Sequence, residues 1–392
     1  MTNRIYYTEP YRTDFDATVV AVDTVDGRPH VTLDQTAFYP TSGGQPFDTG
    51  TLGGAAVSEV IDREDGTIAH VTSGALKVGE VVQGTIDWAR RFDYMQQHTG
   101  QHVLSAAFDR LFGVRTESFH MGTVSATIDL AREVSAAEVA KAEDEANRIV
   151  WEDRPVAIRF ATAEEAAQMP LRKESIRTGP LRLIDVEDFD LSACGGTHVA
   201  RTGAIGVIGI GGSEKFRGGS RVEFLCGGRA LNRFRLWRDS LAATQKFLSV
   251  APGEMAAYIE RMQGESKAQQ RVLRGFQEKL AVHEAHALLE KCGAQSVIIE
   301  ALEGWDAQGL KAIAVAAAAA RPDAVVVLFT TTAPALVVIA RGTAATVDAG
   351  AMLKSLVERF GGKGGGKPDL AQGGGLTGSS VQLLESARAL LG

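Results

Sequence analysis

The chain has 392 residues, of which 45% are hydrophobic and 23% are charged, as in a globular protein of two or three domains. Its formal net charge of −7 excludes a general basic field that would attract nucleic acid, so any contact with RNA must rest on local patches. Three widely separated cysteines indicate a reducing compartment rather than a disulfide framework.

Signals for secretion or for a membrane are missing from the sequence. Its first residues lack the apolar stretch of a secretory signal peptide. The longest apolar run, residues 312–320, is far shorter than the roughly 20 residues that a bilayer-spanning helix needs. We therefore expect a cytoplasmic protein that has no membrane contact.

Residues 1–90 are predicted to form strands. Short runs in which apolar and polar residues alternate are separated by Gly, Asp and Pro turns. This pattern is typical of a small barrel or sandwich, and we expect an N-terminal β-barrel domain over this range.

Residues 91–240 mix helical and strand patterns, which predicts an α+β domain. Residues 98–112 carry apolar side chains at helical spacing, whereas residues 123–130 alternate as a strand does. A second helix is expected after Ser135, which can serve as its N-cap. Residues 206–227 indicate two strands around a basic glycine-rich loop.

Residues 241–291 are predicted to be helical, with a set of apolar residues on one 4-3 register. These residues are Met255, Ile259, Met262, Leu273, Phe276 and Leu280. Such a stretch forms either a helical arm with a coiled-coil dimer seam or a linker helix that packs on its own chain. The sequence does not decide between the two, so a homodimer through this stretch or the C-terminal domain stays open.

Residues 292–392 indicate a C-terminal α/β domain. Continuous apolar runs typical of buried strands lie at 295–300, 324–329 and 335–341. Helices are expected at 306–320, 347–360 and 379–391. The most unusual feature of this domain is the glycine-rich segment 361–375.

Two pairs of metal-binding side chains stand out. Cys194 and His198 flank two glycines and a threonine, while His98 and His102 lie four residues apart in a predicted helix and so project from one face. Together they give one cysteine and three histidines, a set that suits zinc. Alternatively, the two pairs are coincidental, since spacing alone does not prove that the fold brings them together.

Several of these segments resemble a known family. Residues 33–50, 88–108 and 192–206 resemble the editing domain of alanyl-tRNA synthetase and its freestanding relatives, the trans-editing alanyl-tRNA deacylases. Residues 361–375 resemble the C-terminal domain of alanyl-tRNA synthetase, a DHHA1-type module. The layout is similar to that of the long form of the freestanding editing proteins.

This resemblance implies an α+β multidomain fold. It has a barrel at 1–90, an editing domain of the threonyl/alanyl-tRNA synthetase second-additional-domain type at 91–240, a helical arm at 241–291 and a tRNA-binding domain at 292–392. Within this layout, the family's reaction is hydrolysis of the ester that joins a wrong amino acid to alanine tRNA. Serine is the chief wrong amino acid, and whether glycine is also removed is left open. A binding pocket for alanine cannot strongly exclude serine, which only adds a hydroxyl. A second site that hydrolyses the wrong ester therefore corrects the error.

The resemblance also implies roles for individual residues. By this likeness His98, His102, Cys194 and His198 are the ligands of one zinc ion (Zn²⁺). If all four bind at once the metal shell is closed, so we favour zinc as an organiser of the pocket or an electrostatic anchor. Direct activation of water by the metal is the alternative.

Three further residues are candidates for catalysis. Gln45 follows Gly43 and Gly44, whose backbone can approach a substrate closely, and its amide can both donate and accept. Thr36 is the candidate for recognising the serine hydroxyl, with a plain strand threonine as the alternative. His120 matches a position where the freestanding proteins commonly have histidine, and it either lines the pocket or is a structural histidine.

Contacts with tRNA are expected in two glycine-rich segments. The loop at 212–221 carries Lys215, Arg217 and Arg221 and is either a phosphate-binding loop or a mobile hairpin tip. Lys363 and Lys367 lie among glycines of the C-terminal domain, which either allow close approach to RNA or make a flexible turn. The main alternative to a deacylase is a noncatalytic, zinc-stabilised tRNA-binding module.

Overall fold

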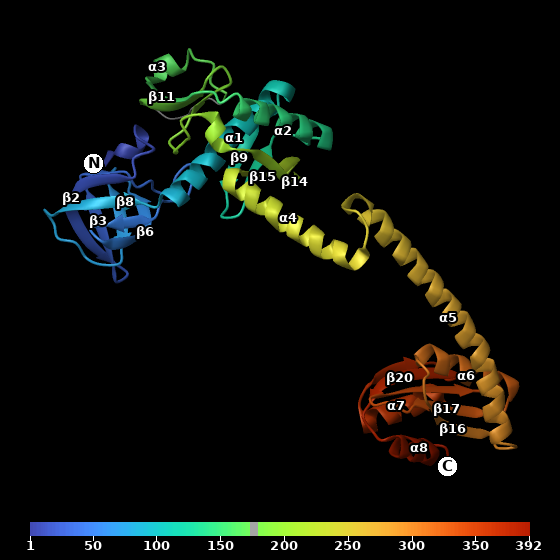
Figure 1. The fold of residues 1–392 in the computed structure, drawn as a ribbon. Helices are drawn as coiled ribbons and strands as arrows, with labels where there is room; N and C mark the ends of the chain where they lie inside the picture. Colours follow the sequence, from blue (N-terminus) through green and yellow to red (C-terminus); the bar gives the residue numbers. More distant parts are fainter. Residues whose placement is uncertain (173–178) are drawn as a thin grey trace. The chain divides into compact units, whose positions relative to one another are not determined.

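The computed structural model describes residues 1–172 and 179–392, which divide into two compact units, 1–244 and 245–392 (Figure 1). In each unit helices pack against β-structure, as expected for an α+β multidomain chain. The two units are considered one at a time below.

A closed barrel of six strands forms the N-terminal part of the first unit, in the order β2-β3-β7-β6-β5-β8 (Figure 1). Its strands are β2 (Asp14–Val25), β3 (Arg28–Leu33), β5 (Gly50–Leu52), β6 (Ala55–Asp62), β7 (Ile68–Thr72) and β8 (Val81–Ile86). Alternate side chains of these strands, with Phe38 from the loop after β4, fill the interior. The predicted N-terminal barrel is confirmed.

The helix α1 (Trp88–Phe112) is the central element of the first unit. It begins after Asp87, whose side chain accepts a hydrogen bond from the Arg90 amide, and it ends at Gly113 in a left-handed conformation (φ 63°). Most of its length is buried, so polar residues on this helix are shielded from water.

Two elements surround α1: a four-stranded antiparallel sheet and the helix α2 (Ala136–Trp151). The strand order in this sheet is β14-β15-β10-β9. The strands are β9 (Thr116–Met121), β10 (Ala126–Leu130), β14 (Ile208–Phe216) and β15 (Gly219–Cys226). The helix α2 begins with a capping box in which Ser135 and Glu138 each bind the other's backbone, as the sequence predicted for Ser135.

A second, three-stranded antiparallel sheet in the order β11-β12-β13 completes the first unit. Its strands are β11 (Val156–Ala161), β12 (Leu181–Val186) and β13 (Asp190–Ala193). Smaller elements are β1 (Asn3–Arg4), η1 (Ile5–Tyr7), β4 (Gln35–Thr36), α3 (Ala163–Ala166) and η2 (Thr202–Ile205).

A buried ion pair connects α1 to the barrel side of the unit. Arg91 and Asp48 are both fully buried and paired with each other. Arg91 also donates to the carbonyl oxygens of Ala37 at 2.6 Å and Pro10 at 2.8 Å, so its guanidinium is well satisfied. This cluster fixes the start of α1, which positions the residues that follow along the helix.

The second unit is built on a five-stranded sheet in the order β16-β17-β18-β20-β19 (Figure 1). Its elements are α5 (Met255–Lys291), β16 (Val297–Leu302), α6 (Ala307–Ala320), β17 (Val325–Thr330), β18 (Ala335–Arg341), α7 (Ala349–Phe360), β19 (Lys363–Gly366), β20 (Leu370–Leu376) and α8 (Ser380–Ala389). One face of the sheet packs on α6 and the end of α5, and the other packs on α7 and α8. The three predicted helices lie where the sequence placed them.

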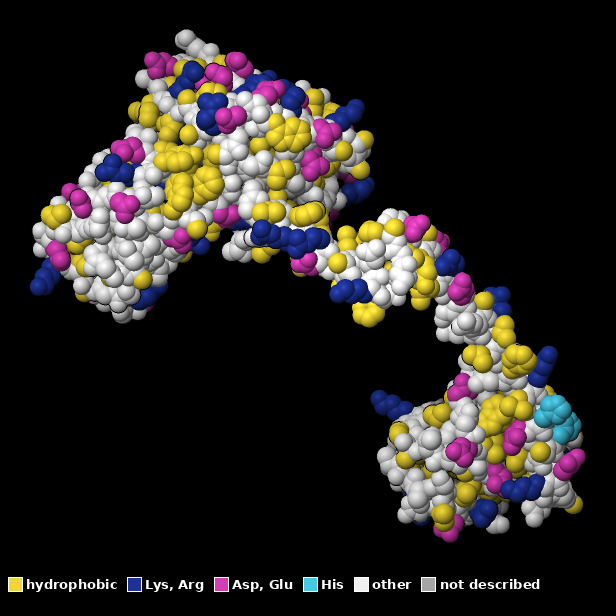
Figure 2. All heavy atoms as spheres, viewed as in Figure 1, with side chains coloured by type: hydrophobic (Ala, Val, Ile, Leu, Met, Phe, Trp, Pro, Cys, Tyr) yellow, Lys and Arg dark blue, Asp and Glu magenta, His cyan; other side chains and the backbone are white. Residues whose placement is uncertain are grey.

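The predicted helical stretch 241–291 consists of two helices rather than one. The helix α4 (Gly227–Leu248) ends before Pro252, which starts the short turn η3 (Pro252–Glu254) ahead of α5. The apolar register residues Ile259, Met262, Leu273, Phe276 and Leu280 are 42–64% exposed. Hydrophobic side chains are visible along this helix in Figure 2. Across residues 1–172 and 179–392, none of the helices combines the length and apolar character that a bilayer crossing requires.

The glycine-rich segment 361–375 contains paired strands, not only a flexible turn. Its two strands, β19 and β20, form an antiparallel hairpin at the edge of the sheet. A Cβ atom on Gly364 would lie 2.6 Å from the Gln372 carbonyl oxygen, and one on Gly366 would lie 2.3 Å from the Ala371 Cα. Close packing of backbone on backbone therefore explains part of the glycine content.

Candidate active site

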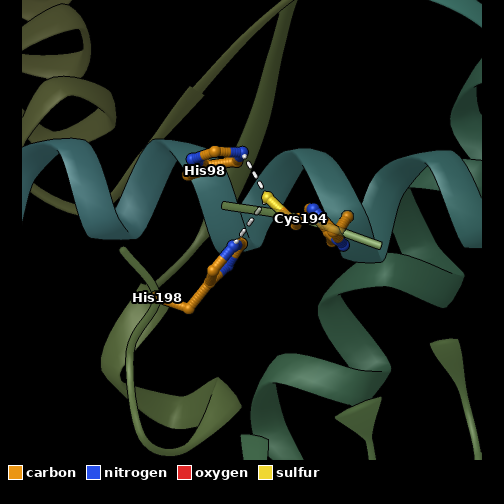
Figure 3. A group of neighbouring side chains, drawn as sticks. His98, Cys194 and His198 are labelled. Carbon is orange, nitrogen blue, oxygen red and sulfur yellow. Dashed lines mark hydrogen bonds between the residues drawn. The ribbon is translucent and has the colours of Figure 1, made fainter. Parts of the chain in front are cut away.

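Two segments distant in sequence meet at a cluster of four side chains. His98 and His102 come from α1, Cys194 directly follows β13, and His198 lies in the loop beyond it (Figure 3). The Cys194 Sγ lies 3.3 Å from the Nε2 atoms of both His98 and His198. One ligand atom from each of the four residues lies within 4.8 Å of the others. The cluster can therefore hold a metal ion.

Each imidazole of the cluster is held through its Nδ1 atom by another buried side chain. The partners are Gln45 for His98 at 2.9 Å, Asp190 for His102 at 2.9 Å and Thr99 for His198 at 3.2 Å. With Nδ1 engaged, Nε2 is the nitrogen left for a metal. Such outer hydrogen bonds orient the histidines of metal sites and raise their basicity.

The glycines of the loop allow the chain to pass close to α1. A Cβ atom on Gly196 would lie 2.2 Å from the Cε1 atom of His98, so only glycine fits there. Gln45 supports the same loop, because its amide donates to the Thr197 hydroxyl at 2.8 Å and its oxygen accepts from the Thr197 amide at 3.1 Å. The structure thus places Gln45, fully buried, behind the cluster.

The electrostatics of the cluster favour metal binding. Burial opposes ionisation of the Cys194 thiol, yet the nearby His98 and hydrogen bonds from His102 and His198 hold its pKa well below the usual value, which favours the thiolate that metals bind. Burial lowers the pKa of His198 to about 3, so its ring is neutral. Burial also acts to lower the pKa of His102, but Asp190 and Cys194 raise it to about 9. A metal ion must therefore displace a proton from His102 at neutral pH.

A cavity of about 470 Å³ lies beside the cluster, and His98, His102 and Cys194 form part of its wall. Tyr7, Phe119 and Phe160 contribute aromatic surface to the cavity. Polar and charged side chains supply about half of the remaining wall, so the cavity is roughly as polar as it is apolar.

Thr36 and His120 are not among the side chains that line this cavity. The Thr36 hydroxyl is fully buried, lies 2.8 Å from the His70 Nε2 and accepts from the Phe38 amide at 3.1 Å. His120 is exposed, with its Nε2 3.3 Å from the Ser118 hydroxyl, and Ser118 does line the cavity. His120 therefore lies one side chain away from the cavity.

Sequence reasoning missed two arginines that line the cavity. Arg182 of β12 is buried and donates to the carbonyl oxygens of Cys194 at 2.7 Å and Gly196 at 2.9 Å, which fixes the loop that carries the cluster. Arg172 donates to Asp190 at 2.7 Å, and Asp190 in turn holds His102. No spacing or charge pattern marks these residues, because each acts across strands.

The basic residues predicted to contact tRNA differ in their surroundings. Arg221 forms a two-pronged pair with Asp129 at 2.6 and 2.8 Å, and Lys215 lies 2.7 Å from Glu133, so acids offset both charges. Arg217 lies over the Phe216 ring in the hairpin between β14 and β15. Lys363 in β19 and Lys367 just after it are exposed.

Three domain families match successive parts of the chain. The family described as tRNA synthetases class II (A) matches residues 11–90, which hold the barrel. Threonyl and Alanyl tRNA synthetase second additional domain matches residues 181–223, which include Cys194 and His198. The DHHA1 domain matches residues 294–391 of the second unit. The first two matches define a protein related to tRNA synthetases.

Whole-chain relatives narrow this class. Alanyl-tRNA editing protein AlaX-L of Pyrococcus horikoshii is 31% identical over 95% of this chain and 94% of its own length. This chain therefore belongs to the alanyl-tRNA editing protein family. Alanyl-tRNA editing protein Aarsd1 of Mus musculus is 34% identical over 66% of the chain and 64% of that protein.

The chain also matches full synthetases over part of their length. Alanine--tRNA ligase of Methanoregula boonei is 34% identical over 95% of this chain. The chain spans only 42% of that ligase.

Proposed function

We propose that this chain is an aminoacyl-tRNA deacylase that acts in trans and hydrolyses the ester joining serine to alanine tRNA. Glycine on the same tRNA is the second candidate substrate. The observation that carries the proposal is the four-residue metal cluster, of which His98, His102 and Cys194 line the 470 Å³ cavity, in a chain of the alanyl-tRNA editing family. An aminoacyl ester is already activated, so positioning a water beside it is enough for hydrolysis.

Zinc is the metal that fits the cluster best. Thiolate and neutral imidazole are ligand types that zinc prefers, and four of them suit its tetrahedral coordination. His98, His102, Cys194 and His198 would hold the ion, with Gln45, Asp190 and Thr99 fixing the imidazoles. Bound zinc would supply positive charge at one end of the cavity and hold the loop in place.

The protein groups around the cavity supply the remaining steps. A water oxygen attacks the ester carbonyl carbon and gives up a proton, the bond from that carbon to the ribose oxygen breaks, and that proton passes to the ribose oxygen. The products are the free amino acid and the ribose hydroxyl of the tRNA. We assign His120 to proton transfer, through water at the Ser118 hydroxyl, which lies 3.3 Å from its ring nitrogen. Gln45 positions His98 and the Thr197 backbone rather than the water.

Contact with tRNA is assigned to basic side chains of both units, all of them exposed except the half-buried Arg221. Lys363 and Lys367 would bind the phosphates of a tRNA on the second unit, and Lys215, Arg217 and Arg221 on the first. Acidic neighbours already offset Lys215 and Arg221, so we rank Arg217, Lys363 and Lys367 as the stronger contacts. A homodimer through α5 remains part of the proposal, since the register residues on that helix other than Met255 are exposed.

A single assay tests the catalytic proposal. Alanine tRNA charged with serine, glycine or alanine is incubated with the protein, and ester loss is followed for each. We expect Ser-tRNA to be deacylated far faster than the correctly charged form. Equal rates for serine and alanine would contradict an editing role.

The metal is tested on the same preparations by elemental analysis. We expect one zinc per chain, its loss in Cys194→Ala with His98→Ala, and its retention in the control Cys292→Ala, whose thiol lies outside the cluster. Retained zinc and tRNA binding without ester hydrolysis would instead indicate the alternative function, a noncatalytic tRNA-binding module.

A further inference from the structure

The three-stranded sheet places an aromatic ring, a guanidinium and the cluster cysteine in one row. Phe160 of β11 pairs directly with Arg182 of β12. The next strand pairs Ala193 with Leu183, and the Cys194 amide then donates to the Arg182 carbonyl oxygen at 3.0 Å. Side chains of directly opposed residues project from the same face of a sheet. All three residues of this row line the cavity.

Strand spacing gives this row a length. Neighbouring strands lie about 4.8 Å apart, so Phe160 lies about 10 Å from Cys194 across two spacings. That span is comparable to the reach of a nucleoside from its ester to the far edge of its base. A substrate whose ester lies at the metal cluster would therefore reach Phe160 with its terminal base.

The exposure of Phe160 fits a contact with a ligand. Its residue is 57% exposed although it forms part of the cavity wall. Aromatic side chains on open sheet surfaces are the platforms on which single-stranded nucleic acids stack their bases. Arg182 occupies the row position between Phe160 and Cys194, and its guanidinium donates to the carbonyl oxygens of Cys194 and Gly196, which holds the backbone of the loop.

We propose that Phe160 stacks on the terminal base of the substrate's single-stranded 3′ end while the aminoacyl ester lies at the metal cluster. This inference rests on the proposed deacylase function, which it extends by naming the nucleoside subsite. Stacking does not read the identity of a base, so Phe160 contributes affinity for any nucleoside and leaves the choice of amino acid to the other end of the cavity.

Two stable analogues separate the base contact from the rest of the site. One carries serine linked by an amide to the 3′ position of adenosine, and the other carries the same amide on a ribose without a base. Calorimetry of the full-length protein gives the Kd of each. In Phe160→Leu, which keeps apolar bulk but removes the ring, binding of the adenosine analogue should weaken about tenfold, in the lower half of the range for one stacked base.

Binding of the analogue without a base should be unchanged in Phe160→Leu, and Phe160→Trp should bind both analogues like the wild type. Trp151→Ala is the matched control, because Trp151 is an exposed aromatic of the same unit, on α2, that does not line the cavity. Zinc content, measured alongside, should be one per chain in every variant. An equal loss of affinity for both analogues in Phe160→Leu, or no loss for either, overturns the stacking inference.

The same variants separate this inference from the function on which it rests. If the wild type fails to hydrolyse mischarged tRNA, the proposed function is wrong whatever the Kd values show. If the wild type hydrolyses it and Phe160→Leu keeps both kcat/KM and the Kd of the adenosine analogue, only the stacking inference is wrong. If the wild type hydrolyses mischarged tRNA but binds the adenosine analogue no better than the analogue without a base, only the stacking inference is overturned.

Discussion

Asp190 is the residue that joins the cluster to the wall of the cavity. It accepts hydrogen bonds from the His102 Nδ1 at 2.9 Å and from Arg172 at 2.7 Å. Burial acts to raise the pKa of the Asp190 carboxyl, but these two partners lower it to about 2. It is therefore ionised at any physiological pH. A fixed negative charge behind His102 holds the ring in one orientation.

We expect Asp190→Asn to weaken zinc binding by about 10- to 100-fold, as is usual for outer-sphere carboxylates of metal sites. Competition with a chromogenic chelator measures this affinity directly. Asp185→Asn is the control, because Asp185 lies on the adjacent strand β12 and pairs with Arg159 away from the cluster. Equal zinc affinity in both variants would show that Asp190 has no effect on the metal.

A substitution of Thr36, which does not line the cavity, tests whether this side chain influences the choice between serine and alanine. Its hydroxyl is engaged by His70 and by the Phe38 amide. If it recognises the serine hydroxyl, Thr36→Val should reduce the preference for serine over alanine by roughly 1–3 kcal/mol, because a hydrogen bond is lost. The ratio of kcat/KM for the two charged tRNAs measures this preference. An unchanged ratio would leave Thr36 with a structural role in the barrel.

At the scale of elements, the joint between α1 and the barrel depends on the buried pair of Arg91 and Asp48. We expect Arg91→Met to lower the free energy of unfolding by about 3–5 kcal/mol, since Asp48 would be left as an uncompensated buried charge. Denaturant unfolding measures the change. Arg63→Ala, which removes an exposed pair with Asp23, should cost no more than about 1 kcal/mol. Similar losses in the two variants would contradict this account.

Two neighbouring glycines in the hairpin of β19 and β20 test whether close backbone packing there contributes to stability. Gly364→Ala should destabilise the protein by about 1–3 kcal/mol, because the new Cβ atom meets the backbone of β20 at 2.6 Å. Gly365→Ala is the matched control, since a Cβ atom there meets nothing within 4 Å. The midpoint of thermal unfolding compares them. Equal midpoints would mean that the hairpin opens without cost.

Local patterns predicted the elements better than the site. Alternation predicted the barrel and the Ser135 cap predicted the start of α2, because such signals act between residues close in sequence. Spacing predicted the two ligand pairs, and the family resemblance implied that His98 and Cys194 share one site. It could not predict Arg182 or Phe160, whose positions depend on the register between strands, and a register that joins distant segments is not written in either segment alone.

For the whole molecule, the division between residues 244 and 245 indicates where the proposed deacylase site can be separated from the proposed tRNA-binding unit. A shortened chain that ends near Val250 should keep its zinc and its maximal deacylation rate but bind tRNA more weakly. Contacts remote from the reacting ester act equally on ground and transition states, so their loss raises KM rather than lowering kcat. Titrations at several salt concentrations should also give a smaller salt slope, because fewer phosphates are neutralised.

The full-length chain, assayed in parallel, is the reference for that comparison. Lys363→Ala with Lys367→Ala in the intact chain should reproduce part of the loss without removing the second unit. Identical tRNA affinity in the shortened and full chains at every salt concentration would mean that the second unit does not anchor RNA. We would then assign dimerisation to the second unit, and sedimentation of the shortened and full-length chains would measure it.

The order in which the cluster is assembled has a consequence for biosynthesis. His98 and His102 are made first, Cys194 and His198 follow some 90 residues later, and the second unit begins only at Gln245. Domains generally fold as units from the N-terminus while synthesis continues. The cluster can therefore capture its metal on the ribosome, before the C-terminal unit exists. Zinc supply would then limit the yield of folded first unit during translation, and metal shortage would leave nascent chains open to proteolysis.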